Sequence, residues 1–228
     1  MSHPDHALWK QSWRGNQIAF HLLHIHPLLI RFWPALGLGA ADRVFVPLCG
    51  KSLDLMWLHG LGHDVVGIEL SPLAIQAFFQ ESGLKPRQTR HGALTRWSQD
   101  RLAIYCGDFF RLKPRDLQGV RVVYDRASLT ALPESLRAPY VAHLAKILPA
   151  GCQILLLTVE DLDDGESEAD ASKASSEIAA LYEARFEIEL KHAGCLPAVV
   201  ENGEVVEPPC VHKAYILSAK QGMDESGR

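Results

Sequence analysis

The sequence predicts an α/β fold: a doubly wound, mostly parallel sheet of seven strands, with a late antiparallel hairpin and an N-terminal helical cover. Apolar runs alternate with amphipathic segments along most of the chain, a pattern typical of the strands and helices of a parallel sheet. The first and fifth runs are continuously apolar, as expected of strands that are buried on both faces. The last two runs have no convincing helix between them, which favours an antiparallel pair.

Short links between the expected elements favour right-handed crossovers. The expected strands are, in chain order, Arg43–Leu48, Asp64–Leu70, Arg101–Cys106, Arg121–Asp125, Cys152–Val159, Phe186–Ala193 and His212–Ala219. The clearest helix follows the second strand, because Ser71 can cap it, Pro72 suits its first turn and Gly83 follows its end. Other helices are expected from Ser52, between Pro133 and Gly151, and near Ser176–Glu183.

Length and composition indicate one globular domain. The chain has 228 residues, 47% of them hydrophobic, which is enough for a sizeable α/β core. We expect a single domain over residues 1–228, in which residues 1–42 cover the ligand edge of the sheet. The five cysteines form no C-x-x-C pair, and neither a secretion signal nor an apolar run of membrane length is visible, so a cytoplasmic protein is expected.

The net charge of −4 is unevenly distributed along the chain. The segment Glu160–Asp170 holds seven acidic residues and no basic one. Such a run favours a solvated segment, so residues 160–172 are expected to form a mobile loop. The rest of the chain contains no cluster of lysine and arginine, which argues against nucleic acid binding.

The stretch VFVPLCGKSLDL contains Gly-Lys-Ser after an apolar run and therefore looks like a phosphate-binding loop. A P-loop needs a second glycine five positions before Gly50, where this chain has Phe45. The dinucleotide fingerprint also fails, since Gly50 is the only glycine between Gly39 and Gly60. The pattern predicts a strand, a tight turn and a helix start, for a nucleotide-like ligand that has no phosphates to hold.

Several polar residues follow the expected parallel strands at their carboxyl ends, where open α/β sheets bind ligands. Leu48 and Gly50 follow the first strand, Glu69 ends the second, Asp108 follows the third and Arg126 the fourth. These residues form a constellation at one edge of the sheet. Its position predicts a ligand site more strongly than any one of the residues would alone.

Each charged member has a functional and a structural interpretation. Glu69 lies about 20 residues after the glycine turn, where an acidic residue can accept hydrogen bonds from both hydroxyls of a ribose. Alternatively, it is an exposed carboxylate that the dipole of the following helix favours at the helix N-terminus. Asp108 can accept from an adenine amino group, with Phe109 or Phe110 against the ring, although DFF also suits a turn with core aromatics. Arg126 is placed to hold a carboxylate or steer an anionic nucleophile, or alternatively to pair with Asp125.

Other residues suggest chemistry less strongly. His21 and His24 have a spacing that metal ligands use on a helix, but Pro27 interrupts the pattern and no cysteine or carboxylate completes a site, so no metal is expected. Cys49 has no identifiable base near it in sequence and is expected to pack in the turn. Of the N-terminal tryptophans, Trp13 is the best candidate to touch a ligand, because a WRGNQ turn starts there.

The motifs WKQSWRGNQIAFH, VFVPLCGKSLDLMWL, GHDVVGIELSPLAIQAFF, YCGDFF and VVYDRASLTALP together resemble the thiopurine S-methyltransferase family in its bacterial form. The resemblance extends from Trp9 to Val159 and returns at LYEARFEIEL. It implies a Rossmann-like class I methyltransferase fold, with S-adenosylmethionine as cofactor. It also implies methyl transfer to the sulfur of a small aromatic or heterocyclic thiol such as a thiopurine, or to a selenium or tellurium species.

The resemblance carries cofactor contacts onto Trp13, Leu48, Glu69 and Arg126, in agreement with the reading of Glu69 from its position. Gly50 and Asp108 complete the expected cofactor-binding set on their position alone. No dedicated catalytic base is expected, because an acidic aromatic thiol arrives largely ionised and mainly needs positioning. The protein is expected to act as a monomer on a small molecule.

One segment departs from the family pattern. After the fifth strand the family carries a Gly-Pro-Pro-Phe stretch that covers the substrate, whereas this chain has DDGESEADASKASSE. Cofactor binding is therefore better supported than any particular acceptor. The alternatives are a non-catalytic module that binds S-adenosylmethionine and an enzyme that methylates nitrogen or oxygen on a small metabolite.

Overall fold

The computed structural model describes residues 5–15, 21–160, 175–196, 200–201, 204–205 and 211–220. The chain divides into two compact units. The first comprises Met1–Tyr124 and Ile147–Pro149, and the second comprises Asp125–Lys146 and Ala150–Arg228.

The first unit is built on a mostly parallel sheet with the strand order β3-β4-β5-β2-β1-β6. Its strands are β1 (Arg43–Val46), β2 (Asp64–Glu69), β3 (Arg87–His91), β4 (Leu94–Gln99), β5 (Leu102–Cys106) and β6 (Val120–Arg126), of which the last two residues belong to the second unit. Strands β5, β2, β1 and β6 run parallel, whereas β3 and β4 form an antiparallel hairpin at the edge. The parallel strands are almost wholly buried, which explains their continuous apolar runs.

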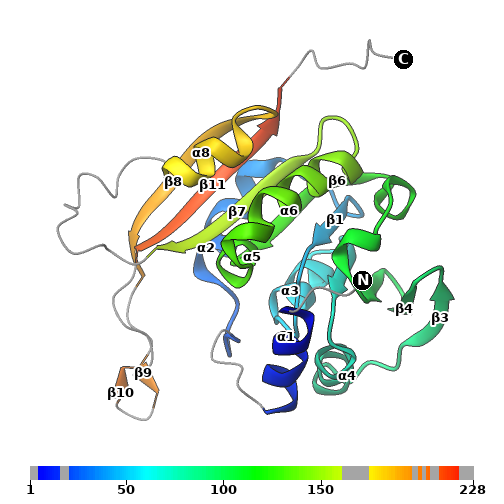
Figure 1. Cartoon of the computed structure of the whole chain (residues 1–228). Helices are drawn as coiled ribbons and strands as arrows, with labels where there is room; N and C mark the ends of the chain where they lie inside the picture. Colours follow the sequence, from blue (N-terminus) through cyan, green and yellow to red (C-terminus); the bar gives the residue numbers. More distant parts are fainter. Residues whose placement is uncertain are drawn as a thin grey trace. The chain divides into compact units, whose positions relative to one another are not determined.

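Helices of the first unit pack on this sheet and on one another. They are α1 (Asp5–Arg14), α2 (Pro27–Phe32), α3 (Asp54–Gly60) and α4 (Pro72–Glu81), with short 3-10 turns η1 (Trp33–Leu36), η2 (Phe109–Arg111) and η3 (Pro114–Leu117). Helices α3 and α4 contact β2, and α1 contacts α4 (Figure 1). As expected, Ser71 caps α4: its hydroxyl accepts a hydrogen bond from the Ala74 N–H at 3.4 Å. The N-terminal segment is helical in part, as the sequence predicts.

The second unit contains three antiparallel strands in the order β7-β11-β8. They are β7 (Gln153–Glu160), β8 (Phe186–Cys195) and β11 (Val211–Ala219), and the two-residue strands β9 (Val200–Glu201) and β10 (Glu204–Val205) pair separately. The helices are α5 (Ser128–Ala131), α6 (Glu134–Ile147) and α8 (Ser176–Tyr182). In Figure 1 the yellow helix α8 lies against the orange strand β8, and the two elements are in contact.

The predicted fold class is confirmed: a parallel core and antiparallel C-terminal strands, with all seven expected strands present. Two corrections concern local structure. β1 ends at Val46, so Leu48 lies in the following turn and not in the strand. The predicted number of seven strands is wrong, since the β3–β4 hairpin adds two more strands to the sheet. This hairpin was not predicted, because its residues are mostly polar and partly exposed and give no apolar run. The acidic loop predicted at residues 160–172 lies outside the described residues apart from Glu160, which ends β7.

Among the described residues, no helix combines the length and the apolar character needed to cross a membrane.

Candidate functional site

Glu69 is the best-placed candidate ligand residue of the first unit. It ends β2 with 6% of its surface exposed. Its Oε2 accepts a hydrogen bond from the Gly50 N–H at 2.9 Å, and its Oε1 accepts one from the Ser71 N–H at 2.7 Å. Burial raises the pKa of Glu69, and hydrogen bonds from the backbone at Ser71, Gly50 and Leu70 partly offset that rise. A carboxylate can accept about four hydrogen bonds in all, so Glu69 keeps capacity for a ligand hydroxyl.

The turn after β1 is shaped for close approach. Leu48 has φ +44°, a conformation that side chains with a Cβ rarely adopt, and Gly50 has φ +52°. The Trp13 ring of α1 lies over this turn, with its Cζ2 and Cη2 atoms 3.3 and 3.7 Å from where a Cβ on Gly50 would stand. Any side chain at Gly50 would therefore meet both a backbone penalty and the Trp13 ring. Trp13, Gly50 and Glu69, predicted separately, thus come together in one place.

Cys49 packs in this turn, as the sequence predicts, and is not a nucleophile. A Cβ added to Gly67 on β2 would lie only 2.8 Å from the Cys49 Sγ, so the thiol occupies the space that the glycine leaves. Burial, reinforced by the charge of Glu69, raises the pKa of the Cys49 thiol well above its usual value. A neutral, enclosed thiol has little reactivity.

Lys51 of the Gly-Lys-Ser sequence does not face a phosphate cradle. Its ammonium donates to the Glu81 carboxylate in the last turn of α4 at 2.7 Å. Its side chain is only 14% exposed, against 49% for that of Glu81. This ion pair explains the lysine by packing and charge within the first unit, and agrees with the absence of a P-loop pattern.

Asp108 lies next to Glu69 along the same sheet edge, because β5 pairs with β2 in the register Glu69↔Cys106 and the Gly107 N–H donates to the Glu69 carbonyl at 2.9 Å. The Asp108 carboxylate accepts from the Phe110 N–H at 3.0 Å and caps η2. Phe109 is buried at 4% exposure, whereas Phe110 is half-buried. The buried core aromatic is therefore Phe109, whereas Phe110 has exposed ring surface that a ligand could contact.

Arg126 ends β6 and belongs to the second unit, where it is half-buried. Its neighbour Asp125 is fully buried, and the Asp125 carboxylate accepts a hydrogen bond from the Tyr140 hydroxyl of α6 at 2.7 Å. Burial raises the pKa of Asp125, and the hydrogen bond from Tyr140 partly offsets that rise. The Asp125 carboxylate thus has a tyrosine hydroxyl as a partner. From the sequence, Asp125 was considered only as a partner of Arg126.

A buried network at the start of α3 was missed by the sequence interpretation. Asp54 is 1% exposed, and its carboxylate accepts from the His26 N–H at 2.9 Å and the Tyr124 hydroxyl at 2.8 Å. The network ties the N-terminal segment to α3, directly after the Gly50 turn. In the sequence, this network is indicated by one acidic residue within the apolar stretch SLDLMWL.

The histidine that follows the pair considered as metal ligands has a structural role. His26 caps α2, since its Nδ1 accepts from the Leu28 N–H at 3.2 Å. Over the residues that the structure covers, no group of three or more His, Cys, Asp or Glu side chains is arranged to hold a metal ion.

Comparison with known proteins gives consistent results. The family model described as thiopurine S-methyltransferase matches residues 4–218. The chain is 48% identical over 223 residues to the thiopurine S-methyltransferase of Stutzerimonas stutzeri (strain A1501), which covers 97% of this chain and 94% of the relative.

Solved structures with low sequence identity share the fold. One, from work on the conversion of a disulfide bond into a thioacetal group during echinomycin biosynthesis, superposes with a TM-score of 0.64 at 16% identity, over 93% of this chain and 92% of that chain. A TehB-like SAM-dependent methyltransferase from Corynebacterium glutamicum ATCC 13032 superposes with a TM-score of 0.52 at 17% identity, over 95% and 98% of the two chains.

Proposed function

Because the chain belongs to the thiopurine S-methyltransferase family, we propose that it transfers the methyl group of S-adenosylmethionine to the sulfur of a thiopurine or another small aromatic thiol. The observation that best supports cofactor binding is the Glu69 carboxylate, which backbone N–H groups hold at the end of β2 beside the Gly50 turn. Selenium and tellurium species are further acceptors that we propose, because they are soft nucleophiles like a thiolate.

The residues of the sheet edge suit the cofactor. Glu69 would accept the two ribose hydroxyls, and Asp108 the adenine amino group. The Leu48–Gly50 turn, lined by the Trp13 ring, would face the aminoacyl end, where a bulky side chain would interfere. Arg126 is proposed as a further cofactor contact on the family resemblance and on its position at the end of β6.

The chemistry requires little of the protein beyond positioning. When bound, the cofactor supplies a methyl group already activated on a positive sulfonium. The residues named above would hold this group in line with the acceptor sulfur, and positioning of this kind can lower a barrier by up to about 7–11 kcal/mol. An aromatic thiol that binds as the thiolate needs no general base, so we assign none. The new carbon–sulfur bond forms as the old one breaks, and the products are a thioether and S-adenosylhomocysteine.

A screen with isotopically labelled S-adenosylmethionine tests the proposal. The acceptors would be a thiopurine, simple aromatic thiols, selenite and tellurite, with hydroxyl and amine analogues of the same rings as controls. We expect label on sulfur and no label on the analogues. Label on nitrogen or oxygen would favour a different acceptor chemistry. Cofactor binding without transfer to any of the acceptors would favour a non-catalytic module.

We also propose that residues 1–228 act as one methyltransferase domain, as a monomer and in the cytoplasm. The span of the family match, residues 4–218, supports a single functional domain. The cysteine pattern supports a reducing compartment. Size-exclusion chromatography with light scattering would test the monomer.

A further inference from the structure

The turn that follows Arg126 holds a residue in an unfavourable backbone conformation. Ala127 has φ 59° and ψ 12°, in the left-handed region that favours glycine. Its N–H donates to the Leu157 carbonyl at 3.0 Å, and its carbonyl accepts from the Ala131 N–H and the Thr130 hydroxyl, each at 2.9 Å. A strained residue persists only where its surroundings fix it, and such residues concentrate at functional sites. The turn therefore fixes the direction in which the chain leaves Arg126.

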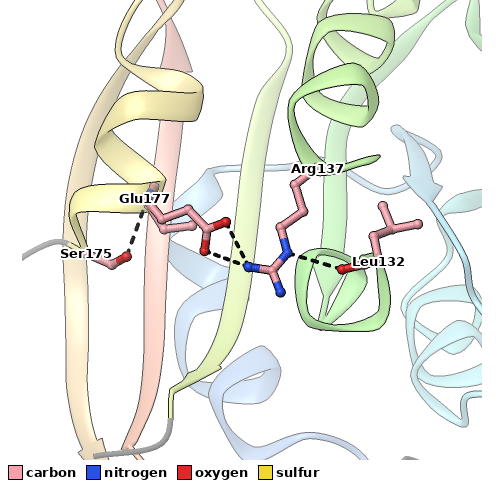
Figure 2. Close-up of polar contacts among 5 residues, drawn as sticks. Leu132, Arg137, Ser175 and Glu177 are labelled. Atoms are coloured by element: carbon pink, nitrogen blue, oxygen red, sulfur yellow. Dashed lines mark hydrogen bonds and ion pairs between the residues drawn. The ribbon is translucent and has the colours of Figure 1, made fainter. Parts of the chain in front are cut away.

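Arg137 of α6 holds the far end of the same turn. Its Nε donates to the carbonyl of Leu132, the C-cap residue of α5, at 3.1 Å. One terminal nitrogen of the same guanidinium donates to both carboxylate oxygens of Glu177, at 2.8 and 3.0 Å (Figure 2). Glu177 lies in the first turn of α8, which the Ser175 hydroxyl caps. Figure 2 shows the guanidinium between the carbonyl on one side and the carboxylate on the other.

A contribution to folding stability is a weak explanation for this arrangement. The side chains of Arg137 and Glu177 are 26% and 44% exposed, and ion pairs at such exposure add little to stability. An ion pair with Glu177 alone would not require the Arg137 guanidinium to donate to the Leu132 carbonyl as well. The planar guanidinium instead holds a carbonyl and a carboxylate at once, in a geometry that the single ammonium of a lysine cannot reproduce.

We propose that Arg137 is a positioning residue for methyl transfer. It fixes the turn Ala127–Leu132 and, through that turn, the placement of Arg126, while Glu177 anchors its guanidinium. Arg137 itself is not proposed to contact the cofactor or the acceptor. The inference rests on the proposed function, in which Arg126 contacts the cofactor.

A double-mutant cycle between Arg126→Ala and Arg137→Ala tests this role, read as kcat/KM for an aromatic thiol and as Kd for S-adenosylhomocysteine. We expect Arg137→Ala to lower kcat/KM about tenfold at a near-normal Tm, because small displacements of positioned groups slow reactions strongly. In the Arg126→Ala background the same substitution should change nothing further. Arg137→Lys should rescue little, and Glu177→Gln should have a smaller effect than Arg137→Ala.

Lys191→Ala is the matched control, because Lys191 pairs with Glu189 on β8, away from the turn but in the same unit, and should retain normal kinetics. Normal kcat/KM in Arg137→Ala, or an equal loss in both backgrounds, would overturn the inference. A wild-type chain inactive on every thiol would instead contradict the proposed acceptor. The cycle would then be decided on the Kd alone: a loss that depends on Arg126 supports the inference, and no loss or an independent loss rejects it.

Discussion

Each unit of the chain buries a carboxylate near the carboxyl end of a parallel strand, and the two carboxylates are held by different donors. Glu69 at the end of β2 is 6% exposed and accepts from two backbone N–H groups, those of Gly50 and Ser71. Asp125, next to the end of β6, is 0% exposed and accepts from the Tyr140 hydroxyl. Burial raises the pKa of both carboxyls.

Burial and a raised pKa therefore do not by themselves distinguish a ligand-binding carboxylate from a structural one. The type of donor and the remaining exposure are more informative. Backbone donors from tight turns use only part of the accepting capacity of the Glu69 carboxylate and leave room for a hydroxyl group of a ligand. Asp125 is instead enclosed with the Tyr140 side chain, itself 0% exposed, and has no surface that a ligand could contact. The comparison predicts that one carboxylate controls affinity and the other controls stability.

The largest effect is expected from Asp125→Ala. Its removal would leave the buried hydroxyl of Tyr140 without this acceptor. The free energy of unfolding should fall by about 2–4 kcal/mol, since a buried hydroxyl left unpaired costs about 1–3 kcal/mol and the missing side chain leaves a cavity. Urea unfolding would measure it. Tyr140→Phe removes only the donor and should cost less, and an Asp125→Ala protein as stable as wild type would show that this carboxylate is not structural.

Glu69→Ala should act on affinity instead. Binding of S-adenosylhomocysteine should weaken by about 1.5–3 kcal/mol, the loss typical of hydrogen bonds to a charged group, or roughly tenfold to 150-fold in Kd. Titration calorimetry on the folded variant would measure it. Glu81→Ala, which removes another carboxylate of the same unit, is the control and should bind normally. An unchanged Kd for Glu69→Ala would remove Glu69 from the cofactor site.

Acid should raise the contribution of Asp125 to the free energy of unfolding, and it should lower the cofactor affinity that depends on Glu69. Because the native pKa of Asp125 is raised above its ordinary 3.8, the folded chain holds more protons than the unfolded chain between those two values. Its contribution to the free energy of unfolding therefore rises as the pH falls through this range, and Asp125→Asn should abolish that contribution. Denaturant titrations of both proteins at several pH values would measure the slope.

Cofactor affinity should change in the other direction, because ribose hydroxyls donate best to an ionised Glu69. The raised pKa of Glu69 implies that affinity for S-adenosylhomocysteine falls before the pH reaches the ordinary glutamate value of 4.5. Glu69→Gln should bind more weakly and show no such fall. A wild-type affinity that stays constant down to that pH would contradict a carboxylate ligand at this position.

Sequence reasoning succeeded where the relevant pattern is local. Glu69 was identifiable because an acidic residue directly ends an apolar run, and Gly50 because the run stops at a turn without a second glycine. The parallel strands β1, β2 and β5 were identifiable because strands buried on both faces carry apolar runs. Trp13 was expected to contact a ligand, but its position over Gly50 was not predicted, because nothing in the local pattern links α1 to that turn.

The features that were missed depend on contacts distant in sequence. The β3–β4 hairpin carries polar, partly exposed residues, and edge strands of this kind give only a weak periodic pattern. The Asp54–Tyr124 bond joins residues 70 positions apart, and the Arg137–Glu177 pair joins residues 40 positions apart. Each charged residue alone is ordinary in a helix. Only the tertiary structure shows that one is buried on a tyrosine hydroxyl and another joins a strained turn to α8.

The smallest effect is expected at Lys51, and it tests whether the Gly50 turn serves a nucleoside cofactor or a phosphate. The lysine is already paired with Glu81 at 2.7 Å, and phosphate binding would have to break that pair. Lys51→Ala should lower the free energy of unfolding by no more than about 1 kcal/mol, as for most ion pairs near a surface. The affinity of this variant for S-adenosylhomocysteine should stay near that of wild type, since Lys51 pairs with Glu81 whereas Glu69 is held by the Gly50 N–H. Millimolar ATP with magnesium should neither raise the Tm of the wild type nor compete with S-adenosylhomocysteine. A clear ATP-dependent rise in Tm that Lys51→Ala abolishes would mean that the lysine exchanges Glu81 for phosphate, and that the turn beside Glu69 does bind phosphate after all.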